Sequence, residues 1–234
     1  MTRLAVIIPV LDEAAAIGDV VARVRVHIQT VIVVDGNSSD QTVARATTAG
    51  ATVIVESRRG YGRAIQAGLT ALPADTDIIV FVDGDGSDRV ELIPSVVAPL
   101  LAGTADFVHG TRTRGEQEAG ALSLPQRVAG SLAGQLLWLL YRVRYTDMSP
   151  FRAISRDALA RLGMQDQSFG WNLEMQMRVA ARGLRVVEIP VGQRRRQGGA
   201  SKVSGDMLTA VRVVWVLTRT LLRIASTLRR ERQV

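Results

Sequence analysis

Cysteine is absent from this chain of 234 residues, and only two histidines, His27 and His109, occur in it. Disulfides, thiolate metal sites and histidine-rich metal sites are therefore excluded. His27 falls in a helical pattern and His109 at the end of a strand, so we expect both to be structural. No apolar run reaches the ~18 residues of a membrane-spanning helix, and we expect no signal peptide, because acidic residues follow the first apolar strand at once.

Lysine is nearly absent too, since Lys202 is the only one and every other cation is arginine. The net charge of +7 is unevenly distributed: residues 182–234 contain 12 basic and 3 acidic residues, whereas the preceding part is close to neutral. A basic C-terminal region favours an anionic partner, either a phosphate, a nucleic acid or an anionic membrane surface. No aromatic residues are interleaved with the basic ones, so we expect no nucleic acid.

Short apolar runs alternate with segments of helical spacing along the chain. The expected strands cover residues 4–8, 31–34, 52–55, 77–82, 105–108 and 184–191. This pattern predicts an α/β fold with a mostly parallel sheet that helices cover on both faces. Residues 128–143 form an expected helix that either packs on the domain or contacts lipid, and we expect Trp138 in the core rather than in lipid. Residues 147–155 form an expected stretch of turns. We expect one domain over residues 1–205 and a basic amphipathic helix over residues 206–234.

Three aspartates follow the fourth expected strand, in the sequence Phe81-Val82-Asp83-Gly84-Asp85-Gly86-Ser87-Asp88. Carboxylates at the end of a buried strand are costly unless a positive charge lies between them. A hard divalent cation is the natural candidate, because Mg²⁺ binds one or two protein carboxylates together with substrate phosphates. The two glycines would let a ligand approach closely. Other acids end neighbouring strands, and ligands bind at this edge of a parallel sheet.

Five segments occur in an order that resembles the family 2 glycosyltransferases, which have the nucleotide-sugar-binding GT-A fold. They are IPVLDE at 8–13, VDGNSSD at 34–40, RGYGRA at 59–64, VDGD at 82–85 and SPFRAI at 149–154. Within the family they resemble the dolichol-phosphate mannose synthase branch, which loads a sugar onto a polyprenyl phosphate.

The resemblance implies a nucleotide-diphospho-sugar as donor and Mg²⁺ or Mn²⁺ held by Asp83 and Asp85. It implies that a set of residues around the same strand ends binds this donor: Pro9, Asp12, Glu13, Asp35, Gly60, Gly62, Arg63, Asp83 and Arg112. It also implies that Asp85, Arg152 and Glu174 act in catalysis, with Glu174 on the helix beneath the sugar.

An arginine-rich, glycine-rich segment covers residues 193–205, QRRRQGGASKVSG. Arginine forks suit phosphate oxygens, and the polyprenyl-phosphate branch carries such a loop beside the lipid phosphate. We therefore expect the acceptor phosphate to bind Arg194, Arg196, Ser201 and Lys202. The sequence leaves two alternatives open: a soluble phosphorylated or glycan acceptor, and a catalytically silent nucleotide-binding or membrane-associated interaction protein.

The C-terminal residues 207–228 are apolar except for a stripe of arginines, Arg212, Arg219 and Arg223. Such a helix lies in a membrane interface, or it packs on the domain or on a second subunit in a homodimer. Arginines at the centre of a bilayer cost ~2.5–3.5 kcal/mol each, which disfavours a spanning helix. We expect a cytoplasmic protein that associates peripherally with the inner face of the membrane.

Overall fold

A seven-stranded sheet organises the computed structural model, which describes residues 2–197 and 218–228. The strands lie in the order β3-β2-β1-β4-β6-β5-β7, and only β6 runs antiparallel to its neighbours. Their bounds are β1 Leu4–Val10, β2 Thr30–Asp35, β3 Thr52–Val55, β4 Ile78–Phe81, β5 Phe107–Thr111, β6 Arg152–Ser155 and β7 Val186–Pro190. The predicted α/β architecture with a mostly parallel sheet is confirmed.

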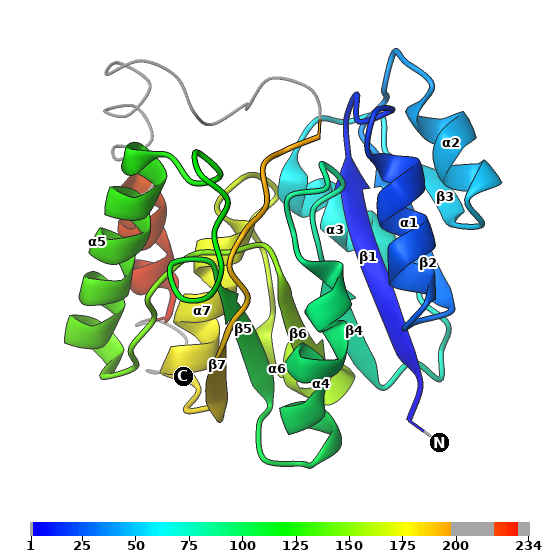
Figure 1. The fold of residues 1–234 in the computed structure, drawn as a ribbon. Helices are drawn as coiled ribbons and strands as arrows, with labels where there is room; N and C mark the ends of the chain where they lie inside the picture. The colour runs from blue at the N-terminus through cyan, green and yellow to red at the C-terminus, as the bar shows by residue number, and fades with distance from the viewer. Residues whose placement is uncertain (1, 198–217, 229–234) are drawn as a thin grey trace.

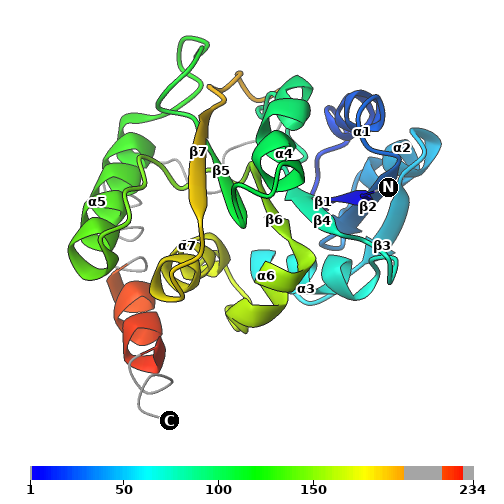
Figure 2. The ribbon, with the colours of Figure 1, turned by 90° about the horizontal axis from the view of Figure 1, so that it is seen from below.

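Helices cover both faces of this sheet (Figures 1 and 2). Three pack on one face: α1 Ile17–Arg25, α2 Thr42–Thr48 and α4 Ile93–Leu101, the last preceded by the 3-10 turn η1 Val90–Leu92. Four helices and a further helical segment pack on the other face: α3 Tyr61–Thr70, α5 Leu124–Tyr141, α6 Arg156–Leu162, α7 Trp171–Ala181 and residues 218–228.

The central strands are apolar throughout because both of their faces are buried. In β1, Ala5 and Ile7 belong to the core beneath α3, whereas Val6 and Ile8 belong to the core beneath α1 and α4. All four of these side chains are fully buried. The continuous apolar run of the sequence is therefore a strand buried between two layers of helices.

The strand directions bring one set of loops to a single edge of the sheet. The parallel strands β1 to β4 all end there, as do β5 and β7. Strand β6 runs the other way and starts at this edge, where Arg152 lies opposite Phe81 of β4. Segments that are far apart in the sequence thus meet at the edge where ligands bind in such sheets.

Strand β6 was not predicted, because we expected residues 147–155 to form turns only. It has four residues, it follows Ser149 and Pro150, and its first residue is an arginine, so it does not read as an apolar run. Ser38 and Ser39 lie before α2 but hydrogen-bond elsewhere: Ser38 donates to Asp35, and Ser39 donates to Asp12. Helix α2 starts at Thr42.

The expected domain boundary at residue 205 lies outside the described residues. Residues 218–228 are helical, as expected, and they pack on the domain through Leu221, Ile224 and Leu228. Arg223 forms an ion pair with the buried Asp166. Over the part of the chain that the structure describes, no helix is both long and apolar enough to cross a bilayer.

Candidate active site

Asp83, Asp85 and Asp88 lie in the turn that follows β4, at the edge where the strand ends meet. Asp85 and Asp88 are buried and Asp83 is partly buried. Burial, followed by the charges of Asp88 and Asp85, raises the pKa of Asp83 well above its usual range. Burial and the charge of Asp85 also raise the pKa of Asp88. These carboxylates therefore repel one another in a place where water compensates them poorly.

The two glycines of this turn serve packing within the chain. A side chain at Gly84 would approach Val10 Cγ1 to 2.3 Å, and one at Gly86, whose φ is +77°, would meet the side chain of Gln197 at 3.0 Å. Protein atoms thus occupy the space that a side chain would need at either position. The two glycines let the turn of residues 83–88, which we call the aspartate turn or carboxylate turn, pack closely on β1 and on the segment after β7.

A divalent cation fits this turn if the protein carboxylates and the phosphates of a substrate bind it together. Among the described residues, no group of three or more His, Cys, Asp or Glu side chains is arranged to hold a metal alone. Asp83 and Asp85 are a pair, and the Asp83 carboxylate accepts no hydrogen bond from the described part of the chain. Hard cations such as Mg²⁺ bind one or two carboxylates and complete their shell with substrate phosphates and water.

Asp12 and Asp35 hold the loops after β1 and β2 together. The Ser38 hydroxyl links them, since it accepts a hydrogen bond from the Asp12 backbone N–H at 2.8 Å and donates to the Asp35 carboxylate. The Asp12 carboxylate accepts the Ser39 N–H at 2.8 Å. Pro9 lies in β1 before this loop. Both acids are thus at the expected edge, and each carries at least one hydrogen bond that orders a loop.

Gly60 and Gly62 allow the N-terminus of α3 to pack on residues 166–168. A side chain at Gly60 or Gly62 would come within 2.2 Å of a backbone oxygen of Gln167 or Asp166. The N–H groups of Gly62 and Arg63 donate to the carbonyls of Ser168 and Gln167 at 3.1 and 3.2 Å. These amides are therefore already occupied, and the glycines have a packing role.

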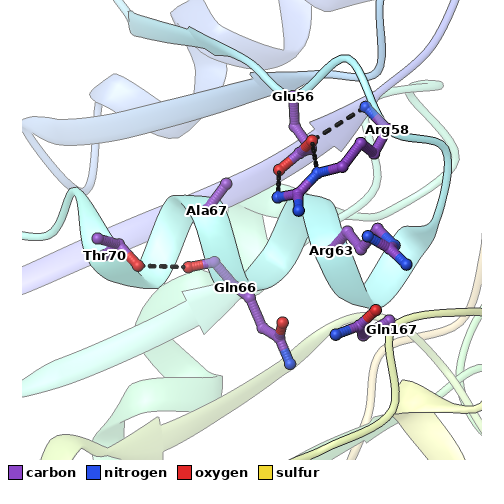
Figure 3. Close-up of a pocket in the computed structure, with 7 residues that line it drawn as sticks. All are labelled: Glu56, Arg58, Arg63, Gln66, Ala67, Thr70 and Gln167. Atoms are coloured by element: carbon purple, nitrogen blue, oxygen red, sulfur yellow. Dashed lines mark hydrogen bonds and ion pairs between the residues drawn. The ribbon is translucent and has the colours of Figure 1, made fainter.

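Arg63 lines a hollow of about 230 Å³ next to this loop (Figure 3). Glu56 and Arg58 pair on one side of the hollow, with 2.8 Å between Oε2 and Nη2, and Gln167 lies on another side. Within the described residues the Arg63 side chain donates no hydrogen bond. Glu56 follows β3, and its N–H bonds to the Asp35 carbonyl at 2.9 Å. The hollow therefore lies next to Asp35, which is expected to bind the nucleotide, and the Arg63 side chain provides a positive charge there.

Arg112, just after β5, makes a two-pronged ion pair with Asp147. Its Nε donates to Oδ2 at 2.7 Å and its Nη2 to Oδ1 at 2.8 Å. Although burial acts to raise it, the pKa of Asp147 falls to about 2, because Arg112 hydrogen bonds hold the carboxylate ionised. Arg112 also acts electrostatically on Asp83 and Asp88. Sequence reasoning missed Asp147 because it falls in the stretch that we expected to be turns.

Arg152 is fully buried at the start of β6. Its guanidinium donates to the carbonyls of Ser149, Pro150 and Asn172. Burial lowers its pKa to about 10. The expected catalytic arginine thus contacts backbone rather than an open pocket, and it brings a buried positive charge close to the carboxylate turn.

Glu174 is also buried, at 2% exposure. Its carboxylate accepts the N–H groups of Gln165 and Asp166 and pairs with Arg178 at 2.8 Å. These contacts differ from those expected of an acid beneath the sugar. Glu174 thereby holds the 165–168 loop on which Gly60 and Gly62 pack, and its expected part in catalysis stays a prediction.

The segment after β7 reaches across the aspartate turn. Arg196 Nε donates to Asp85 Oδ2 at 2.9 Å, and its Nη2 contacts Glu13 Oε1 at 3.0 Å. Arg194 pairs with Glu91 at 2.7 Å. The structure therefore brings two expected acceptor residues beside the expected donor site. Ser201 and Lys202, the other two, lie outside the described residues.

Comparison with known proteins identifies the family. The family model for glycosyl transferase family 2 matches residues 5–163. The chain belongs to this family. The predicted family and the predicted class of enzyme, a glycosyltransferase, are confirmed.

The relatives and solved structures extend this result. An uncharacterized glycosyltransferase of Mycobacterium tuberculosis is 39% identical over 86% of this chain and 90% of its own length. The undecaprenyl-phosphate mannosyltransferase of Micrococcus luteus is 31% identical over 88% and 89%, and the dolichyl-phosphate hexose transferase of Haloferax volcanii is 32% identical over 83% and 84%. These two names agree with the branch that the motifs resemble.

The fold is also found in a crystal structure of glucosyl-3-phosphoglycerate synthase from Mycobacterium tuberculosis, in complex with Mn²⁺ and UDP. It has a TM-score of 0.73 over 95% of this chain and 80% of that one, at 22% identity. This likeness confirms the predicted GT-A fold.

Proposed function

We propose that this family 2 glycosyltransferase moves a sugar from a nucleotide-diphospho-sugar to a polyprenyl phosphate with the help of Mg²⁺ or Mn²⁺. An oxygen of the acceptor phosphate forms the new bond to the anomeric carbon of the sugar. The bond from that carbon to the diphosphate breaks, and its electron pair leaves with the nucleoside diphosphate. A phosphate is ionised at neutral pH, so the reaction needs positioning more than a strong general base.

The residues at the sheet edge divide this work. Asp83 and Asp85 would hold the cation, which neutralises charge that develops on the leaving diphosphate. Arg63 and the hollow beside it lie on the nucleotide side, next to Asp35. Arg112 is held beside the carboxylate turn by Asp147, and Glu174 supports the loop behind α3. Arg194 and Arg196 supply cations for the acceptor phosphate.

The exposed face of α5 is the observation that favours a lipid-borne acceptor. Six large apolar side chains on this helix are between 39% and 61% exposed: Val128, Leu132, Leu136, Trp138, Leu139 and Leu140. The helix contains no acidic residue. Arg142 and Arg144 lie over the Trp138 ring, 5.2 and 5.9 Å from its centroid. An apolar face with a tryptophan and a cationic rim fits an interface with anionic lipid.

The alternative acceptor is a soluble phosphorylated molecule. The structural neighbour named above supports it, since its complex contains glucosyl-3-phosphoglycerate. A transfer assay separates the two acceptors: UDP-glucose and GDP-mannose are offered with undecaprenyl phosphate in detergent or with 3-phosphoglycerate, each with Mn²⁺ or with EDTA. We expect transfer to undecaprenyl phosphate in the presence of Mn²⁺ and no transfer in EDTA. Transfer only to the soluble ester contradicts the proposed acceptor, and full activity in EDTA contradicts the proposed cation.

A further inference from the structure

Residues 193–197, which we call the strap, are fastened to the aspartate turn by the backbone. The Arg194 N–H donates to the Ser87 carbonyl at 2.9 Å, and the Gln197 N–H donates to the Asp85 carbonyl at 3.0 Å. The Gln197 side chain covers Gly86. The strap leaves β7 and runs to the loops that follow β1 and β4, where Figure 1 shows it in orange. Its placement fixes where the Arg196 side chain can reach.

Arg196 bridges carboxylates from two separate loops. Asp85 belongs to the turn after β4, and Glu13 belongs to the loop after β1. Their side chains are only 12% and 9% exposed. Both oxygens of Asp85 are used, since Oδ2 accepts from Arg196 and Oδ1 accepts the Ser87 N–H at 2.9 Å. In this conformation Arg196 supplies the positive charge that two nearly buried carboxylates require.

A divalent cation and the Arg196 guanidinium therefore compete for the same oxygen. A cation bound to Asp85 Oδ2 would lie beside the Arg196 guanidinium that donates to this oxygen, and two positive groups at one carboxylate repel each other. We infer that Arg196 is a built-in counterion of Asp85 and Glu13, that the cation arriving with the donor displaces it, and that the released guanidinium then binds the acceptor phosphate. This inference rests on the function proposed above.

The exchange imposes an order on binding. One guanidinium cannot hold Asp85 and Glu13 and also bind an acceptor phosphate. Arg194 pairs with Glu91 and with neither Asp85 nor Glu13, so the exchange changes the availability of Arg196 and not of Arg194. The acceptor site would thus be complete only after the cation has arrived, so the cation increases affinity for the acceptor. By linkage, the acceptor phosphate increases affinity for the cation by the same factor.

Direct Mn²⁺ binding tests the competition without any turnover. Mn²⁺ affinity is measured by electron paramagnetic resonance on the wild type, Arg196→Ala, Arg196→Lys and Arg195→Ala, after circular dichroism shows that each is folded. Arg195→Ala removes the same charge from an exposed side chain on the same strap, so it controls for net charge. We expect Arg196→Ala to bind Mn²⁺ at least about tenfold more tightly, since a charge-assisted contact is worth ~1.5–3 kcal/mol.

The outcomes separate the inference from the proposed function. Arg195→Ala should match the wild type, and Arg196→Lys should lie between the wild type and Arg196→Ala, because lysine keeps the charge but lacks the fork that spans both acids. Equal Mn²⁺ affinity for the wild type and Arg196→Ala overturns the inference and leaves the metal site standing. Equal tightening by both alanine variants also overturns it, because net charge would then be the cause. Failure of every protein to bind Mn²⁺ overturns both the inference and the proposed cation.

Farnesyl phosphate, a short water-dispersible prenyl phosphate, tests the second half of the inference. Its affinity is measured by calorimetry with and without Mn²⁺ and UDP or GDP. In the wild type and Arg195→Ala we expect the cation and nucleotide to increase this affinity, and in Arg196→Ala we expect no such increase. If Mn²⁺ and nucleotide leave the affinity of the wild type for farnesyl phosphate unchanged, Arg196 is not released toward the acceptor. The same conclusion follows if they increase this affinity equally in Arg196→Ala.

Discussion

At the scale of single residues, Asp85 has the most contacts that bear on function. It receives the Ser87 N–H and the Arg196 guanidinium, and its charge raises the pKa of Asp83 and Asp88. Its side chain lies in a turn and supports no apolar core. Chemistry and stability are therefore separable at this position.

Asp85→Asn should abolish most transfer while it leaves the fold intact. The amide oxygen can still accept the Ser87 N–H, but the charge that would bind a cation is lost. We expect transfer to fall by about 10²-fold or more, because a bound cation contributes several kcal/mol to the transition state. Asp75→Asn, in the loop before β4 at the opposite edge, is the matched control. Near wild-type transfer in Asp85→Asn would contradict the metal assignment.

Glu174 provides the contrasting case of a buried carboxylate in a supporting position. Removing one partner of a buried ion pair costs ~3–5 kcal/mol, so Glu174→Ala should lower the free energy of unfolding by about that amount in urea titrations. Asp19→Asn, which breaks an exposed pair with Arg23, should cost ~1 kcal/mol or less.

Kinetics distinguish positioning from proton transfer at Glu174. Glu174 holds the loop behind Gly60 and Gly62, so Glu174→Gln should raise the donor KM more than it lowers kcat. It should also leave the pH profile of kcat unchanged. Loss of one limb of that profile at wild-type stability would show instead that Glu174 acts as a catalytic acid or base.

At the scale of elements, α5 differs most from its sequence-based description. We expected Trp138 in the core, yet it is 41% exposed. Gly130 and Gly134 explain the orientation, because a side chain at Gly134 would come within 2.0 Å of the Tyr145 carbonyl. The side of the helix with Gly130, Gly134 and Leu137 packs inward, whereas the leucines at 132, 136, 139 and 140 are exposed. The order of apolar residues along the chain could not reveal this, because both sides of the helix are apolar.

The exposed α5 face should bind anionic membranes. In flotation with phosphatidylglycerol vesicles, Leu136→Ser/Leu139→Ser should bind at least about tenfold more weakly, since burying one leucine is worth ~1.5–3 kcal/mol. Leu101→Ser on α4, where the leucine is also 52% exposed, should bind like the wild type. If the protein instead forms a soluble dimer that does not bind vesicles, and if the double variant is monomeric, then α5 is a subunit interface.

The C-terminal region was predicted in part. Residues 218–228 are helical, as expected, and they pack on the domain core, which was one of the alternatives that the sequence left open. Only Leu222, at 63% exposure, is a large apolar side chain that remains exposed on this segment. Within the described residues, the membrane contact that we propose therefore rests on α5 and not on this segment.

At the scale of the whole molecule, His109 links the buried core to pH. It lies in β5 between Phe107 and Tyr145, and burial, with the charge of Arg152, lowers its pKa to about 3. The unfolded chain takes up a proton near pH 6.5, and the folded chain does not. The contribution of His109 to folding stability is thus fully present above pH 6.5 and is lost as the pH falls toward 3.

Urea titrations at several pH values measure this linkage. Between pH 6.5 and pH 4, His109 should contribute a slope of about 1.4 kcal/mol per pH unit to the free energy of unfolding. His109→Leu should lack that slope whatever its absolute stability. A slope that persists unchanged in the variant would assign the pH dependence to other groups.

The alternation of strands and helices located the edge of the sheet that carries Asp12, Asp35 and Asp83, because parallel strands end on the same side. The partners of these residues could not be predicted. Asp147 contacts Arg112 from a distant part of the chain, and the glycines pack against backbone that only the folded chain brings close. Local patterns report strands and turns, whereas these contacts join segments that lie far apart in the sequence.

The edge of the sheet opposite the candidate site offers a position for a fluorescent label. None of the candidate site residues lies in the loop at residues 102–105, where Ala102 is exposed at the end of α4. Because the sequence has no cysteine, Ala102→Cys creates a single thiol for a fluorescent dye. Energy transfer from that dye to labelled lipid would report how the protein is oriented on a vesicle, with the reporter kept away from both substrates.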